Sequence, residues 1–252
     1  MPESSSLHRL SALARRALPE SVYGAARALG NLALTPLLFS YYTGHARSAL
    51  RGRAVDRHGQ PVTWYTLPMN ELLSAKDFAD REILELGGGQ STLWWAARAR
   101  RVVCLEADPA WYQHLRGLVP ANVELHLCTD FAALEQALAG RRFDLVLVDG
   151  LDVPALGRLS CARRAQDWIT PGGAVLLDNS EGPWSDDGRF RIMDHYRGLH
   201  FQRVDFYGFC AGNIAPSCTS IFFSGQAPCF LFSGAEDPSI PYPLRQPDAK
   251  GR

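Results

Sequence analysis

Short apolar runs alternate with helix-like segments between about residue 81 and residue 200. Most runs are about five to seven residues long and rich in Val, Leu and Ile. Strands of this kind are typical of a parallel sheet whose two faces are covered by crossover helices. The pattern predicts strands at 82–86, 101–106, 123–127, 143–149 and 174–178. Helices are expected at 91–100, 109–118, 131–139, 155–169 and about 187–198.

Two further apolar runs, at 201–209 and 218–224, follow the last predicted helix. A loop rich in Gly, Asn and Pro separates them, and it is too short to hold a crossover helix. Strands joined by so short a connection must run antiparallel. We therefore expect an α/β fold with a seven-stranded, mostly parallel sheet that ends in an antiparallel pair of strands.

The N-terminal segment has a different pattern. Residues 5–18 read as a short amphipathic helix with three arginines off the apolar face, and Pro19 ends it. Residues 28–44 are then free of charge, but Asn31 and Pro36 disfavour a membrane-spanning helix. A secretory signal is also disfavoured, whereas a transit peptide would suit a eukaryotic source. Two interpretations remain: a helical cap packed on the main domain, or a peripheral membrane anchor.

Composition supports an ordinary globular domain with appendages. The chain has 252 residues, with 26 Lys and Arg against 26 Asp and Glu, so no nucleic-acid partner is expected. Residues 1–58 nevertheless hold eight Arg and three acids. We expect a basic helical extension at 1–58, a catalytic domain at 59–233 and a Pro-rich tail at 234–252.

The six cysteines show no zinc-ligand spacing and no paired C-x-x-C motif. Cysteines scattered among apolar residues are typical of small buried side chains in a reducing compartment. The sequence therefore predicts a cytoplasmic protein in which residues 1–45 are the part available for peripheral contact with a membrane.

A glycine-rich turn follows the first predicted strand. Gly87-Gly88-Gly89 lies between that strand and a helix, so a ligand can approach the backbone closely. Thr92 stands where a dinucleotide motif has its third glycine, which weakens the case for a pyrophosphate site. Glu85 precedes the turn by two residues, and a carboxylate there favours a cationic ligand over a diphosphate.

At this point residues 80–225 resemble the class I S-adenosylmethionine-dependent methyltransferases. Glu106 ends the second strand where that family binds the ribose hydroxyls, and the turn at 170–173 also matches. The resemblance implies a Rossmann-like fold and S-adenosylmethionine as cofactor. It assigns cofactor binding to Glu85, Gly87, Gly88, Gly89, Ser91, Glu106, Ala107, Asp130, Phe131 and Asp149. Two alternatives stay open, because Glu106 could merely end its strand and Asp130 could merely cap the next helix.

Three oxygen-bearing side chains lie at predicted strand ends. Asp149, Asp178 and Asn179 resemble the magnesium site of the catechol O-methyltransferase group, and hard oxygen ligands suit Mg²⁺. That group has a lysine base three residues after the first Asp, where this chain has Asp152. The alternative is that Asp149 contacts the cofactor while the other two residues cap a turn.

Asp149, His195 and Asp152 are the candidate catalytic residues. The sequence at Asp149 lacks the loop with which amino-group methyltransferases hold planar nitrogens, which favours O-methylation of a small-molecule or sugar-like acceptor. An NAD(P)-binding oxidoreductase and a noncatalytic binding protein of the same fold are the alternatives. The aromatic lead-in at 59–68 either lines the acceptor pocket or packs as a lid over the sheet edge.

Overall fold

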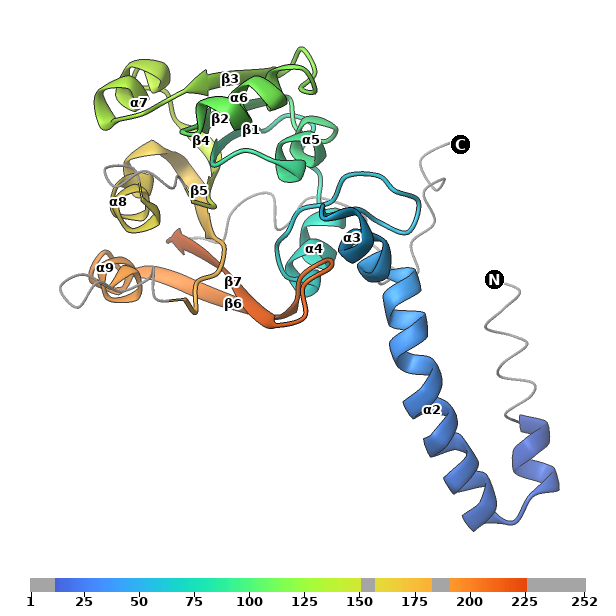
Figure 1. Cartoon of the computed structure of the whole chain (residues 1–252). Coiled ribbons are helices and arrows are strands. Elements are labelled where there is room, and N and C mark those ends of the chain that lie inside the picture. The colour runs from blue at the N-terminus through green and yellow to red at the C-terminus, as the bar shows by residue number, and fades with distance from the viewer. Residues whose placement is uncertain (1–11, 151–156, 183–190, 226–252) are drawn as a thin grey trace.

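The computed structural model describes residues 12–150, 157–182 and 191–225 (Figure 1). It contains a seven-stranded sheet of order β3-β2-β1-β4-β5-β7-β6. Strands β1 to β5 are parallel, and β7 pairs antiparallel with both β5 and β6. The strands are β1 Glu82–Leu86, β2 Arg101–Glu106, β3 Val123–Leu127, β4 Phe143–Val148, β5 Ile169–Leu177, β6 Phe201–Phe209 and β7 Pro216–Ser224. The predicted fold class is confirmed.

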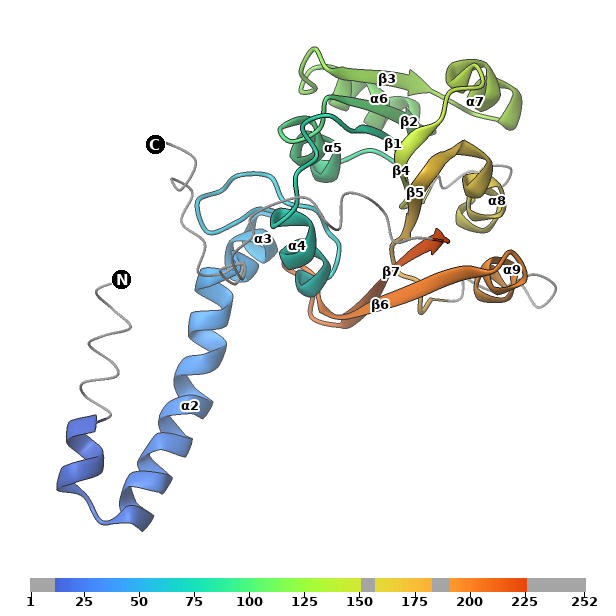
Figure 2. The same cartoon turned by 180° about the vertical axis from the view of Figure 1, so that it is seen from behind.

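Helices cover both faces of this sheet. One apolar cluster joins it to α7, α8 and α9, and a second cluster on the other face joins it to α4 and α5 (Figures 1 and 2). These helices and α6 are α4 Leu67–Ser74, α5 Gln90–Ala96, α6 Pro109–Arg116, α7 Phe131–Leu138, α8 Arg158–Arg164 and α9 Ile192–Gly198. Burial on both faces explains why most strands are apolar throughout.

Several predicted boundaries differ from the structure, and at two of them the local structure differs as well. The helix expected at 155–169 is the shorter α8 followed by a 3₁₀ turn, Ala165–Trp168. The turn expected at 170–173 lies inside β5 as an irregularity, because Ile169 pairs with Phe143 and Ala174 pairs with Leu145. Gly172 has φ of +80°, which a glycine adopts without strain. The Pro-rich tail expected at 234–252 lies outside the described residues.

The N-terminal segment forms a long arm. Residues 12–17 are helical, and α2, Glu20–Tyr42, projects away from the sheet and ends beside α3, His45–Arg51 (Figures 1 and 2). None of the 23 residues of α2 is buried. The expectation of a packed cap is therefore wrong for α2, since its side chains do not reach the apolar clusters. Within the part of the chain that is described, no helix is long and apolar enough to cross a membrane.

Candidate functional site

The glycine turn after β1 lies between β1 and β4, where the order of the strands in the sheet reverses. Gly87 donates its N–H to the carbonyl of Leu105 at 2.9 Å, and Asp149 donates its N–H to the carbonyl of Leu86 at 3.0 Å. Gly87 has φ of +93°, and a Cβ there would lie 2.4 Å from the carbonyl oxygen of Gly150. Only glycine fits this position, so the turn and the end of β4 form one backbone unit.

Gly88 and Gly89 have different surroundings. A Cβ on Gly88 would lie 2.6 Å from Sγ of Cys104, whereas a Cβ on Gly89 would meet nothing within 4 Å. The N–H of Gly89 donates to Oγ1 of Thr92 at 2.9 Å, and that hydroxyl donates to Oε2 of Glu85 at 2.5 Å. The Thr92 hydroxyl therefore links the turn to Glu85. This contact explains why the fold does not need glycine at position 92. Ser91 is buried beside it in α5.

Glu85 lies beneath the turn and is fully buried. Its Oε1 has no hydrogen-bond partner among the described atoms. Burial raises the pKa of this carboxyl to about 7, although Ser91 and Thr92 oppose the shift by hydrogen bonding. The carboxylate that sequence analysis assigned to ligand contact thus acts on the turn through Thr92.

The raised pKa of Glu85 predicts a pH-dependent stability. Below about 4.5 the carboxyl is protonated in both states, but between 4.5 and about 7 only the folded state keeps the proton. Stability should therefore fall as pH rises through this window, by up to about 3 kcal/mol. Glu85→Gln should lose this component, so its free energy of unfolding should drop less between pH 5 and 8 in urea titrations. Parallel curves for the two proteins would contradict the prediction.

Glu106, at the end of β2, joins the same turn. Its Oε2 accepts the N–H of Gly88 at 3.1 Å, and its Oε1 accepts the N–H groups of Ala107 at 2.7 Å and Asp108 at 2.9 Å. Its residue is only 7% exposed, and Ala107 beside it is buried too. The structure therefore brings the β2 acid and the glycine turn together.

Sequence reasoning missed Trp111, which lies against this turn. Asp108 caps α6 by accepting the N–H groups of Ala110 and Trp111. The indole N–H of Trp111 donates to the carbonyl of Gly88 at 2.8 Å, while the residue remains 42% exposed. The Asp-Pro start of α6 was the available signal, because it fixes Trp111 in the first helical turn.

Asp130 and Phe131 have structural partners of their own. Asp130 caps α7 by accepting the N–H of Ala133 at 2.8 Å. The guanidinium of Arg164 lies over the Phe131 ring, 5.5 Å from its centroid. For Asp130 the capping role that the sequence left open is therefore present in the structure.

The acceptor-side candidates meet at the ends of β4 and β5, but an arginine lies among them. Arg158 donates from Nη2 to Oδ1 of Asp149 at 3.2 Å and from Nη1 to Oδ1 of Asn179 at 3.3 Å. Asp178 is buried and accepts the Thr219 hydroxyl at 2.7 Å. Burial, with the nearby Asp149 carboxylate, raises the pKa of Asp178 to about 8.

This arrangement does not fit a resident divalent ion. The guanidinium already takes the oxygens of Asp149 and Asn179 that would bind the ion. Asn179 has φ of +51°, and its carbonyl accepts the N–H of Gly182 in a turn. No group of three or more His, Cys, Asp and Glu that could hold a metal occurs in the described part of the chain. The alternative in which Asp178 and Asn179 shape a turn agrees better with these contacts.

The candidate catalytic residue His195 is not brought to this edge. His195 on α9 lies 3.3 Å from Oε1 of Gln166, in the 3₁₀ turn that precedes β5. That turn is at the amino end of β5, whereas Asp178 follows its carboxyl end. His195 thus lies at the opposite edge of the sheet from Asp149, which does not support a catalytic role beside that residue. Asp152 lies outside the described residues.

The aromatic lead-in, residues 59–68, packs onto the sheet edge at which β4 and β5 end, which we call the acceptor edge. Tyr65 is fully buried, and burial together with the carboxylates of Glu85 and Asp149 raises the pKa of its hydroxyl. The N–H of Thr66 donates to Oγ1 of Thr219 at 3.1 Å. Trp64 donates its indole N–H to the carbonyl of Ala211 at 2.9 Å and is 44% exposed. These contacts agree with packing of the lead-in over this edge, and Trp64 is its exposed aromatic residue.

Residues 84–180 match the family model described as a methyltransferase domain. This range begins in β1 and ends just beyond Asp178 and Asn179, so it includes the glycine turn, Glu106 and the end of β4. This part of the chain is therefore similar to a methyltransferase domain.

The methyltransferase domain is also similar to solved structures at low identity. An O-methyltransferase, TomG from Streptomyces achromogenes, is 19% identical, with coverage of 75% of this chain and 89% of that one and a TM-score of 0.47. An O-methyltransferase from Bacillus cereus is 16% identical, with coverage of 79% and 96% and a TM-score of 0.45. A comparison with curated proteins gives no significant match.

Proposed function

We propose that this methyltransferase domain transfers a methyl group from S-adenosylmethionine to an oxygen of a small-molecule or sugar-like acceptor. The observation that carries the proposal is the contact between Glu106 and Gly88, which joins the β2 acid to the glycine turn. A carboxylate at that position offers acceptors to a pair of ribose hydroxyls. The open space at Gly89 leaves room for a ligand to approach the backbone.

When bound, S-adenosylmethionine supplies an electrophilic methyl group on a sulfonium. The chain's own task is to hold an acceptor oxygen in line with that methyl group. Asp149 would take the proton that the acceptor oxygen gives up on receiving the methyl group from the sulfonium, which would leave as a neutral thioether. Arg158 fixes the direction of the Asp149 carboxylate by its hydrogen bond. We propose that this guanidinium, rather than Mg²⁺, is the cation of the site.

An oxidoreductase is not favoured, because the Thr92 side chain fills the position where a dinucleotide motif needs glycine. Titration with S-adenosylhomocysteine and with NADH separates the two classes. Methyl transfer itself is tested by a screen of metabolite extracts with labelled S-adenosylmethionine. Label in an acceptor supports an enzyme, whereas cofactor binding without any transfer across the screen favours the noncatalytic alternative.

Replacing Glu106 should weaken the cofactor site. Glu106→Ala should raise the Kd for S-adenosylmethionine about 10-fold to 100-fold, because buried hydroxyl groups would lose their acceptor. Isothermal titration calorimetry measures the change. Glu124→Ala is a suitable control, since Glu124 pairs with Arg101 and Arg141 on the half-exposed side of β3. Unchanged affinity in a folded Glu106→Ala protein would contradict the ribose assignment.

The cysteines bear on the compartment. Four of them, Cys104, Cys128, Cys210 and Cys218, are buried and take part in no disulfide among the described residues. Buried free thiols are typical of proteins kept in a reducing compartment. We therefore propose that the protein works on the cytoplasmic side of the cell.

A further inference from the structure

The arm formed by α2 exposes large apolar side chains around its whole circumference. Leu32 is 74% exposed, Leu37 is 67% exposed and Tyr41 is 64% exposed. Successive helical residues are turned by about 100°, so exposed leucines at 29, 32, 34, 37 and 38 point in several directions rather than along one stripe. A partner helix would cover one stripe, whereas lipid can cover a large part of the circumference.

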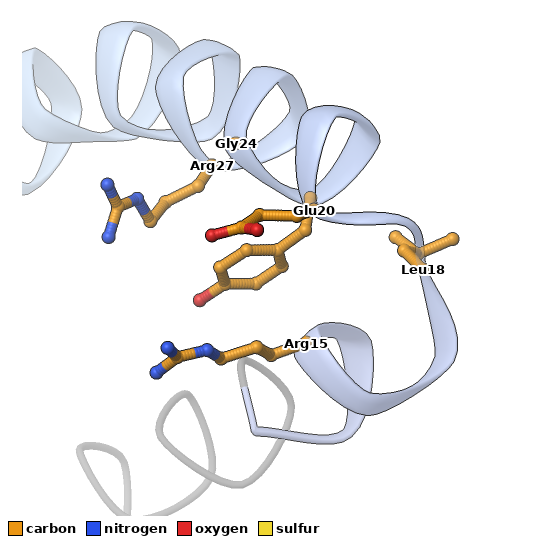
Figure 3. Close-up of a pocket in the computed structure, with 6 residues that line it drawn as sticks. Arg15, Leu18, Glu20, Gly24 and Arg27 are labelled. Carbon is orange, nitrogen blue, oxygen red and sulfur yellow. The ribbon is translucent and has the colours of Figure 1, made fainter.

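The far end of the arm carries a basic hollow. Arg15, from the short helix, and Arg27, from α2, point their guanidinium groups to the same side of the arm (Figure 3). The Arg27 guanidinium lies over the Tyr23 ring, 6.0 Å from its centroid. The hollow measures about 470 Å³ and is also lined by Leu18, Glu20 and Gly24. Two guanidiniums against the single carboxylate of Glu20 leave one net positive charge. This charge complements a phosphodiester headgroup.

The other end of the arm meets the domain at the acceptor edge. The Phe39 ring lies 6.2 Å from the Phe209 ring at the end of β6, and the N–H of Gly212 donates to Nδ1 of His45 at 3.2 Å. The loop from β6 to β7 extends beyond the same edge as Asp178, because Thr219 of β7 binds that carboxylate. Ile214 in this loop is 95% exposed. Exposed apolar side chains thus continue from α2 to the proposed acceptor site.

We propose that α2 and the β6–β7 loop dock on an anionic phospholipid bilayer, with Arg15 and Arg27 binding lipid phosphates. The basic N-terminal segment and the apolar helix act together in this binding. The docked orientation turns the acceptor edge toward the lipid. On the proposed methyltransferase function, the acceptor is then an amphiphile whose polar group lies at the bilayer surface.

Vesicle flotation of the full chain tests the docking. The protein should float with vesicles that contain phosphatidylglycerol, float less with pure phosphatidylcholine, and dissociate as salt is raised. Arg15→Gln with Arg27→Gln should bind about 25-fold more weakly, because each arginine near an anionic surface contributes about fivefold. Leu32→Asp with Leu37→Asp should abolish flotation. Leu118→Asp, on the half-exposed turn after α6, is the matched control and should float normally.

Circular dichroism and S-adenosylmethionine titration on the same preparations separate folding and cofactor binding from docking. Equal flotation of all variants, or none by the unmodified chain, overturns the docking proposal even where cofactor binding is intact. A protein that is dimeric in light scattering and does not bind vesicles also overturns the docking proposal. The apolar surface of α2 would then be covered by a second copy of the chain. If the unmodified chain does not bind S-adenosylmethionine, the proposed function is refuted. The flotation result then still decides the docking proposal.

The acceptor class has its own readout. A lipid extract reconstituted in phosphatidylglycerol vesicles should incorporate labelled methyl groups into the organic phase with the unmodified chain. The Leu32→Asp, Leu37→Asp protein should incorporate far less at equal cofactor affinity. Label that appears only in water-soluble acceptors, at equal rates for the unmodified chain and the Leu32→Asp, Leu37→Asp protein, contradicts the proposal of an amphiphilic acceptor.

Discussion

Gly87→Ala is expected to destabilise the domain by at least about 3 kcal/mol and to abolish S-adenosylmethionine binding. The residue has φ of +93°, where an added side chain is strained, and its Cβ would lie 2.4 Å from the Gly150 carbonyl oxygen. Neither atom can yield without moving the backbone that joins β1 to β4. Urea unfolding measures the loss of stability, and calorimetry measures the loss of binding.

Gly89→Ala is the matched control for this prediction. Gly89 has φ near 180°, which any residue adopts, and its Cβ would meet nothing within 4 Å. The variant should therefore keep nearly full stability. Its S-adenosylmethionine affinity should nevertheless fall, because the methyl group would enter the space proposed for the ligand. A Gly87→Ala protein as stable as Gly89→Ala would show that the turn is not fixed as described.

Asp149→Asn is expected to lower methyl transfer to an identified acceptor about 100-fold to 10,000-fold, the range for loss of a general base. Asparagine keeps an oxygen that accepts the Arg158 hydrogen bond, so the geometry of the strand end should persist. The Kd for S-adenosylmethionine should stay close to that of the unmodified chain. Steady-state rates and calorimetry give the two quantities. A parallel loss of cofactor affinity would make Asp149 a cofactor ligand instead of the proton acceptor.

Chelation is the control for this interpretation. If the Arg158 guanidinium is the cation of the site, exhaustive EDTA treatment should leave the rate unchanged, and added Mg²⁺ should not raise it. Arg158→Ala should slow transfer, and Arg158→Lys should restore part of the rate because a positive charge returns. Activity that disappears with EDTA and returns with Mg²⁺ would instead establish a metal at Asp149.

Local sequence signals determined the sheet and the cofactor side of the site. Apolar runs predict the central strands because helices on both faces of the sheet exclude water from most of their positions. The Gly87–Gly89 turn was predicted from its place between a strand and a helix, and Glu106 from the resemblance to the methyltransferase family. Parallel strands align their carboxyl ends at one edge, which brings the two together. Their hydrogen bond in the structure, between Glu106 and Gly88, follows from that alignment.

Only the tertiary structure decided which polar side chains meet. Asp149 and Asn179 are 30 positions apart, and no pattern along the chain indicates that Arg158 lies between them. His195 was a candidate catalytic residue, yet α9 holds it beside the segment before β5, away from Asp149. Likewise, the N-terminal segment left open a packed cap or a peripheral membrane anchor, and only the structure shows that no residue of α2 is buried. Contacts between distant side chains depend on how the helices pack on the sheet, and long-range packing sets that arrangement. A strand or a glycine turn is instead specified by residues close to it in the sequence.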